Sequence, residues 1–178
     1  MKRHLSLIAF LLTSLLLPAG EYKLGTRGTL NIDVPPKWSV MSKSLEGVEG
    51  FEMTVKSPGT NNIACKLTLY FKKKPEPENK NMVEAQFKAY LDPLLPYSVE
   101  KKPDVKDFTM KSGFGIYTSL TNARMVGKPK VKDKWKTITI GLIAMNDSLV
   151  AAAEIQSDDT KDPLFQQAIG MIQSMTVK

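Results

Sequence analysis

Two consecutive segments near the C-terminal end are apolar on both faces that a β-strand presents. The first, residues 135–145, places Ile138, Ile140 and Leu142 on one face and Thr139, Gly141 and Ile143 on the other. The second, residues 148–156, contains the small run Ala151-Ala152-Ala153. Strands of this kind belong in the middle of a sheet that is covered above and below. Because Asn146-Asp147 separates the two segments, we expect them to form a hairpin.

Further segments alternate apolar and polar residues, which is the pattern of strands with one buried face. They are residues 28–35, 51–56, 63–72, 105–111 and 113–126. We expect the last of these to run to Val126, with Phe114, Ile116 and Leu120 on one face and Tyr117 on the other. An extended stretch with Trp38 and Val40 follows the first strand.

Two segments have the period of amphipathic helices. Asn81 and Glu84 have the spacing of a capping box, and the stripe that follows consists of Val83, Phe87, Tyr90, Leu91 and Leu94. Asp162-Pro163 predicts the start of a second helix, whose stripe consists of Leu164, Phe165, Ala168, Ile169, Ile172 and Met175. The elements together predict an α+β fold, an antiparallel sheet of about six strands flanked by helices.

The N-terminal segment has the pattern of a cleavable secretory signal. Met1-Lys2-Arg3-His4 is positively charged, residues 5–17 carry no charge, and Pro18-Ala19-Gly20 supplies a helix break and small residues. The apolar run is short for a helix that spans a bilayer, which needs about 20 residues. An uncleaved N-terminal anchor is the alternative to a cleaved signal. We therefore expect a signal peptide at 1–20 and a single exported domain at 21–178, periplasmic or secreted, without a transmembrane segment.

The scarcity of cysteine and histidine limits the chemistry of the exported domain. Cys65 is the single cysteine, so no intramolecular disulfide can form, and its strand position predicts a buried, inert thiol. His4 is the single histidine and lies in the predicted signal. Ser-His-Asp and Cys-His catalysis are thereby excluded, and we expect no catalytic site and no cofactor.

Two groups of carboxylates are candidates for chemistry, and both have a simpler structural interpretation. Asp158, Asp159 and Asp162 are a candidate cation site, but we favour their structural role, since acids before a helix more often interact with the positive end of its dipole. Glu154 is the one charged residue in an apolar strand. It could act as a general acid or base, but we favour a position at the rim, where it reaches water or a lysine.

The charge of the chain favours anionic surroundings. The formal charge is +7, and loss of Lys2 and Arg3 with the signal lowers it to +5. Five lysines alternate through residues 126–136: Lys128, Lys130, Lys132, Lys134 and Lys136. In an extended arm their ammonium groups would converge on one surface and dock onto an acidic protein or an anionic envelope surface. A protective role, in which lysines and Pro129 keep sheet edges and loop tips from aggregating, is the simpler interpretation and the one we favour from the sequence. The concentrated basic stripe of a nucleic-acid binder is absent from the sequence.

The order of elements resembles that of the PsbP-like family. The similarity rests on Pro35-Pro36-Lys37-Trp38, Tyr90-Leu91, Gly113-Phe-Gly-Ile-Tyr117 and the closing Phe165…Ile172-Gln-Ser-Met175. The resemblance implies an α/β/α sandwich that serves as a non-catalytic adaptor, with partners that differ between members. It implies no particular partner-binding residues.

Three functions follow from these patterns, and a non-catalytic binding or adaptor protein is the one we favour. The first alternative is a carrier of an apolar small molecule or lipid, for which Gly141, Ala151 and Ala153 would leave space between sheet and helix. We favour close packing of helix on sheet as the explanation of these small residues. The second alternative is a histidine-free hydrolase that uses Glu154 or a Ser-Lys pair.

Overall fold

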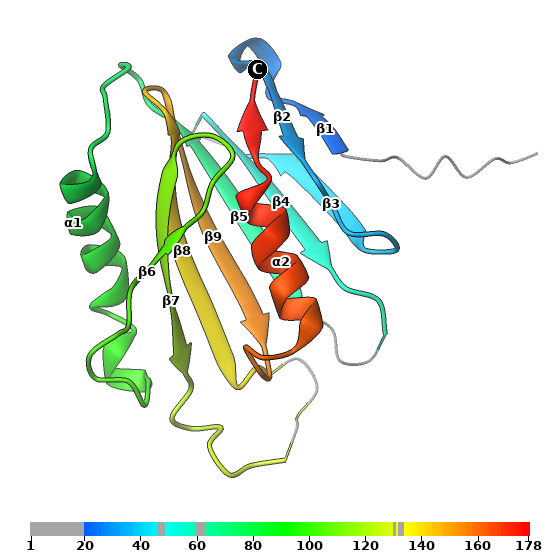
Figure 1. Ribbon diagram of the computed structural model, residues 1–178, viewed down its shortest axis with the longest axis vertical. Helices are drawn as coiled ribbons and strands as arrows, with labels where there is room; N and C mark the ends of the chain where they lie inside the picture. Colours follow the sequence, from blue (N-terminus) through cyan, green and yellow to red (C-terminus); the bar gives the residue numbers. More distant parts are fainter. Residues whose placement is uncertain (1–19, 46–48, 60–62, 130, 132–133) are drawn as a thin grey trace, which may run out of the picture.

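The structure is a computed structural model, and it describes residues 20–45, 49–59, 63–129, 131 and 134–178. These residues form a mixed α+β domain with two antiparallel sheets and two α-helices (Figure 1). The predicted signal at 1–20 lies outside the described residues, except for Gly20. Within the described part, no helix is both long enough and apolar enough to cross a bilayer.

The larger sheet has seven strands among the described residues, in the order β3-β4-β5-β9-β8-β7-β6. In chain order they are β3 (Ser39–Ser44), β4 (Gly50–Lys56), β5 (Ala64–Phe71), β6 (Lys106–Phe108), β7 (Phe114–Thr121), β8 (Thr137–Asn146) and β9 (Leu149–Ser157). The predicted hairpin is confirmed, since β8 and β9 pair and both lie inside the sheet. The Ser148 N–H donates to Asn146 Oδ1 at 2.9 Å and closes its turn.

A second sheet was not foreseen. It consists of β1 (Gly20–Lys23), β2 (Thr29–Ile32) and β10 (Thr176–Val177), with β2 in the middle. β1 and β10 were missed because four-residue and two-residue strands are too short to have a period. The expected single sheet of about six strands is therefore replaced, in the described residues, by one of seven strands and one of three.

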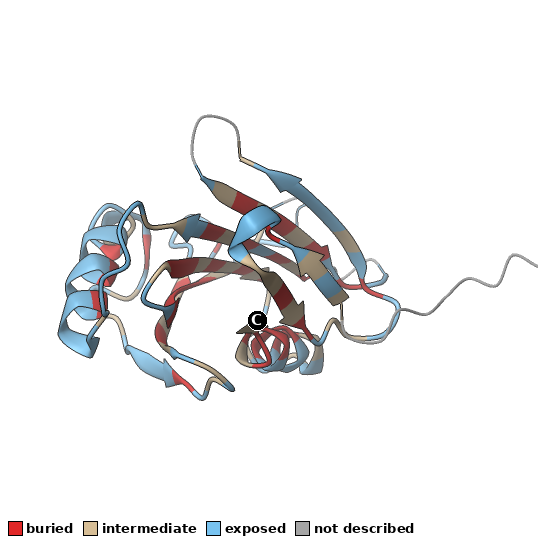
Figure 2. Ribbon diagram, turned by 90° about the horizontal axis from the view of Figure 1, so that it is seen from above, coloured by how far each residue is buried: buried red, intermediate tan, exposed pale blue. Residues whose placement is uncertain are grey.

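The helices α1 (Lys80–Leu91) and α2 (Pro163–Gln173) cover opposite faces of the larger sheet. Alternate residues of β8 supply the two cores: Ile140 and Leu142 pack in the α1 core, whereas Ile143 packs in the α2 core. The second sheet lies on the α2 side. Figure 2 shows that each helix buries its inward side and exposes its outward side. The prediction that both faces of the central hairpin are covered is confirmed.

The start of α1 differs from the prediction. Its N-cap is Asn79, whose Oδ1 accepts the Met82 N–H at 3.0 Å, and not Asn81. Tyr90, which we placed in the apolar stripe, is 53% exposed, and Leu94 lies beyond the helix end. The rest of the predicted stripe, Val83, Phe87 and Leu91, is buried, and at 100° per residue Tyr90 lies at the edge of this stripe, where it reaches solvent. For α2, the predicted cap is confirmed, since Asp162 Oδ1 accepts the Leu164 N–H at 2.8 Å.

Strand β7 is shorter than expected. It ends at Thr121 instead of Val126, and β8 begins at Thr137, two residues after Trp135. After Thr121 the chain turns: the Met125 N–H donates to the Asn122 carbonyl, and Gly127 has a φ of 69°. The turn and the left-handed glycine end the extended strand before the first of the five lysines, so they leave the predicted alternation of the lysines a prediction.

Candidate binding site at the end of strands β7 and β8

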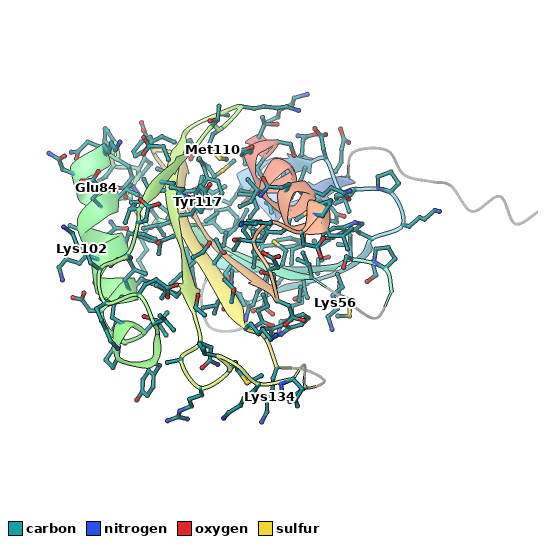
Figure 3. The ribbon with its side chains drawn as sticks, turned by 60° about the horizontal axis from the view of Figure 1, so that its bottom comes forward. Lys56, Glu84, Lys102, Met110, Tyr117 and Lys134 are labelled. Atoms are coloured by element: carbon teal, nitrogen blue, oxygen red, sulfur yellow. The ribbon has the colours of Figure 1, made fainter. Side chains whose placement is uncertain are left out.

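The connection between β7 and β8 forms one end of the molecule, at the bottom of Figure 1. Of the five predicted lysines, Lys128 and Lys134 are exposed and Lys136 is half-buried. Figure 3 shows Lys134 at this end, beyond the strands. Lys130 and Lys132 lie outside the described residues. The convergence of the five lysines on one surface therefore stays a prediction.

A hollow of about 310 Å³ lies next to these lysines. It opens between the start of β8, the segment after Thr121, and the short 3-10 helix η2 (Leu95–Tyr97) that follows α1. Its lining is mainly apolar and aromatic, with contributions from Leu94, Tyr97, Leu120, Trp135 and Ile138. A concave apolar lining with a few polar groups at its edge is typical of a ligand-binding site.

Backbone hydrogen bonds connect the three segments that line the hollow. The Ala123 N–H donates to the Tyr97 carbonyl at 3.0 Å, and the Asn122 N–H donates to the Lys136 carbonyl at 2.8 Å. An isolated bridge joins Ser98 to Asn122. Because the segments are bonded to one another, the hollow exists before any ligand is bound, which lowers the entropy that binding must overcome.

Arg124 lies at the edge of the hollow. Its Cζ is 5.6 Å from the centroid of the Tyr97 ring, a cation–π arrangement. Among the described residues, no carboxylate forms an ion pair with Arg124, Lys128, Lys134 or Lys136. The described residues of this end therefore place four cations without an ion-pair partner among them beside, or in the same connection as, an apolar hollow.

Two carboxylates are hydrogen-bonded to lining residues of the hollow. Glu100 accepts from the backbone N–H and the hydroxyl of Thr121, each at 2.6 Å. Burial by itself raises the pKa of Glu100, but the Thr121 hydrogen bonds outweigh it and leave the pKa below its ordinary value. Glu154 Oε1 accepts from Gln156 Nε2 at 2.6 Å. An anion deep in the hollow would be repelled from this side.

Three exposed apolar side chains belong to the same segments. Tyr97 is 60% exposed, Val126 is 58% exposed and Val131 is 41% exposed. Exposed apolar residues next to an apolar hollow are typical of an interaction surface. We call this surface the basic end and define it by Tyr97, Arg124, Val126, Lys128, Val131, Lys134, Trp135 and Lys136.

Glu154 lies on β9 between Lys66 of β5 and Ile140 of β8. It is half-buried, and its carboxylate accepts a hydrogen bond from the side chain of Gln156. The expectation of a position at the rim, in reach of water or a lysine, is met only in part. The residue is not fully buried and lies across from Lys66, but β9 is an inner strand of the sheet.

The three aspartates near α2 have structural partners. Asp162 caps the helix, and Asp159 Oδ1 accepts the Lys161 N–H at 2.8 Å. In the part of the chain that the structure describes, no three His, Cys, Asp or Glu side chains are grouped so as to hold a metal ion. The preferred interpretation of these acids as a helix start is confirmed for Asp162.

The space expected beside Gly141, Ala151 and Ala153 is filled. A Cβ atom at Gly141 would lie 2.5 Å from Phe108 Cε2. Ala151 and Ala153 are 0% and 3% exposed in the core that includes α2. The alternative of ligand space at these positions is not met, and the favoured close packing describes them, because Phe108 and the core occupy the room that the small side chains leave.

Tyr97, Arg124 and Trp135 were not predicted from the sequence as residues of a binding site. No local pattern connects them, since Tyr97 precedes β7 and Trp135 precedes β8. The one available signal was that Arg124 and Trp135 flank the lysine-rich segment.

No protein-family model matches the chain, and a comparison with curated proteins found no match.

Proposed function

We propose that this chain is an exported, non-catalytic binding protein whose basic end docks onto an acidic partner protein. The observation that carries the proposal is the preformed apolar hollow with Arg124 in its lining and with Lys134 and Lys136 on either side of the lining residue Trp135; neither these cations nor Lys128 form an ion pair with a described carboxylate. Complementary charge accelerates association and selects the partner, while apolar contacts supply most of the affinity.

The chemistry of the domain supports a function without turnover. Residues 21–178 contain no histidine. The single thiol, Cys65, is fully buried, and burial together with the charge of Glu154 raises its pKa to about 12. A buried neutral thiol is a poor nucleophile. A screen for ester, phosphate and glycoside hydrolysis is expected to detect no turnover, and any turnover that survives repurification would contradict the proposal.

The arrangement of the elements supports a relationship to PsbP-like adaptors. One helix on each face of an antiparallel sheet is the α/β/α order that this resemblance implies. The second sheet of three strands was not part of that expectation. A fold of this kind serves as a scaffold, so the function must be argued from the basic end and not from the fold alone.

Charge reversal tests the proposed docking surface. Lys128→Glu with Lys134→Glu is compared with Lys73→Glu plus Lys74→Glu, an exposed pair that changes the net charge equally but follows β5 at the other end of the sheet. The probe is polyglutamate, titrated at 50 and 200 mM salt. We expect the first variant alone to lose about tenfold or more in affinity, and the wild type to weaken at the higher salt. Equal binding by both variants at low salt would overturn the proposal.

Export is tested by sequencing the N-terminus of the processed protein. Signal cleavage follows the apolar run closely, so we expect the mature chain to begin between residues 19 and 23. Gly20–Lys23 forms β1 and pairs with β2, which favours a start no later than Gly20. Retention of Met1 would contradict the signal.

A second candidate function is transport of an apolar ligand, and a different hollow favours it. A groove of about 470 Å³ lies between α1 and β6, with Phe87, Leu91 and Ile116 in its lining. Lys80 Nζ and Asp107 Oδ1, 2.9 Å apart, join the two sides. A delipidated sample should then take up a fluorescent fatty acid, and Ile116→Trp should block uptake. Absence of uptake would reject the carrier.

A further inference from the structure

We propose that the hollow at the basic end is the anchor pocket for an acidic peptide segment of the partner. One apolar side chain of the peptide enters the hollow between Leu94 and Ile138, and a neighbouring peptide carboxylate pairs with Arg124. This inference rests on the proposed docking function and adds the chemistry that the site recognises.

The lining of the hollow determines what can enter it. Leu94, Leu120 and Ile138 are aliphatic, and Trp135 adds an aromatic surface. At about 310 Å³ the hollow is at the small end of the range for ligand sites, which suits one side chain and not a large cofactor. Burial of an apolar side chain here removes its surface and the surface of the hollow from water, and this is the main source of affinity.

The charges place the anionic part of the ligand outside the hollow. Two carboxylates adjoin the lining, because Glu100 accepts hydrogen bonds from Thr121 and Glu154 accepts one from Gln156. The guanidinium of Arg124 is exposed at the edge and is held over Tyr97 at 5.6 Å. A ligand with an apolar centre and flanking carboxylates matches this order of charge.

A peptide matches the basic end better than a bilayer does. A membrane-bound surface inserts its own apolar side chains into the lipid, whereas a hollow receives a side chain from its partner. Lys128 and Lys134 extend the positive charge beyond Arg124, so a chain with several carboxylates can be contacted along its length. Arginine, tyrosine and tryptophan are also the residues that dominate the binding energy of protein interfaces.

The test compares two short peptides that differ in one side chain. Both carry two glutamates on each side of the central residue, which is phenylalanine in one and alanine in the other. Binding to the mature protein is followed by calorimetry at low salt. We expect the phenylalanine peptide to bind about tenfold or more tightly than the alanine peptide.

Variants locate the preference in the hollow. Ile138→Phe fills it from β8 and Leu94→Phe fills it from the turn after α1, so that failure of one variant to fold leaves the other. Both are expected to abolish the preference for phenylalanine and to keep the weaker binding of the alanine peptide. Val105→Phe, in the groove beside α1, is the matched control and should keep the preference. Arg124→Gln should weaken both peptides.

The outcomes separate this inference from the proposed function. Equal, salt-sensitive binding of the two peptides would overturn the anchor pocket and leave the docking function standing. If neither peptide binds and polyglutamate does not bind either, both the anchor pocket and the proposed docking function are overturned. Binding to anionic phospholipid vesicles that Ile138→Phe abolishes, without a peptide preference, would overturn the peptide in favour of a membrane surface.

Discussion

Phe108 lies on Gly141, and a Cβ atom at position 141 would stand 2.5 Å from Phe108 Cε2. The ring also packs on Tyr117, with centroids 4.5 Å apart. Phe108 belongs to β6, the strand at one end of the sheet, so these contacts attach that edge strand to β7 and β8. The missing side chain at Gly141 is therefore a packing requirement for the position of β6.

Gly141→Ala is expected to destabilise the protein by about 1–3 kcal/mol, because the new methyl group overlaps the Phe108 ring and also approaches the Ile116 carbonyl at 3.2 Å. Urea unfolding of Gly141→Ala, Phe108→Leu and the double variant measures the coupling. The double variant should be more stable than the sum of the single effects predicts. Additive effects would show that the ring and the glycine do not interact.

Cys65 should make stability fall at alkaline pH. Burial raises the pKa of the folded thiol to about 12, whereas an unfolded thiol ionises near its ordinary value. The folded state therefore holds more protons above about pH 9, and its stability decreases as the pH rises toward 12, by at most about 1.4 kcal/mol per pH unit. Urea unfolding of wild type and Cys65→Ala should diverge in this window. Rapid labelling of the native thiol by a maleimide would contradict the burial.

Glu100 should contribute to stability at neutral pH and lose that contribution in acid. Its pKa is lowered in the folded state, because the hydrogen bonds from Thr121 outweigh the effect of burial. The stabilisation is present above the unfolded pKa and disappears as the pH falls through the folded pKa. Glu100→Gln should reduce the difference in unfolding free energy between pH 7 and pH 3. An unchanged difference would mean that the Thr121 contacts do not favour the carboxylate.

Asp162 caps α2, so its replacement should lower the free energy of unfolding more than most substitutions at the surface do. Asp162→Ala removes the acceptor for the Leu164 N–H and is expected to cost about 1 kcal/mol in unfolding free energy. Asp162→Asn keeps an acceptor and should cost less. Asp159→Ala, which lies in the preceding turn, is the control for charge. Equal losses for alanine at both positions would argue against capping.

The faces of the central hairpin were predictable because they depend on local periodicity. The side chains of β8 alternate, so Ile140 and Ile143 had to face different layers, and both layers had to be covered. Burial of Cys65 followed from the same rule. The end of β7 was not predictable in this way, because residues 122–126 remain compatible with a strand until Gly127 and the turn at Asn122 are known.

The sequence by itself determined the fold class, the two helices, the hairpin turn and the absence of histidine chemistry from residues 21–178. Each of these follows from composition or from spacing within one segment. The tertiary structure alone decided that Tyr97, Arg124 and Trp135 share one hollow, and that Phe108 fills the space beside Gly141. These contacts join segments far apart in the chain, and their geometry depends on strand order and register, which local patterns do not encode.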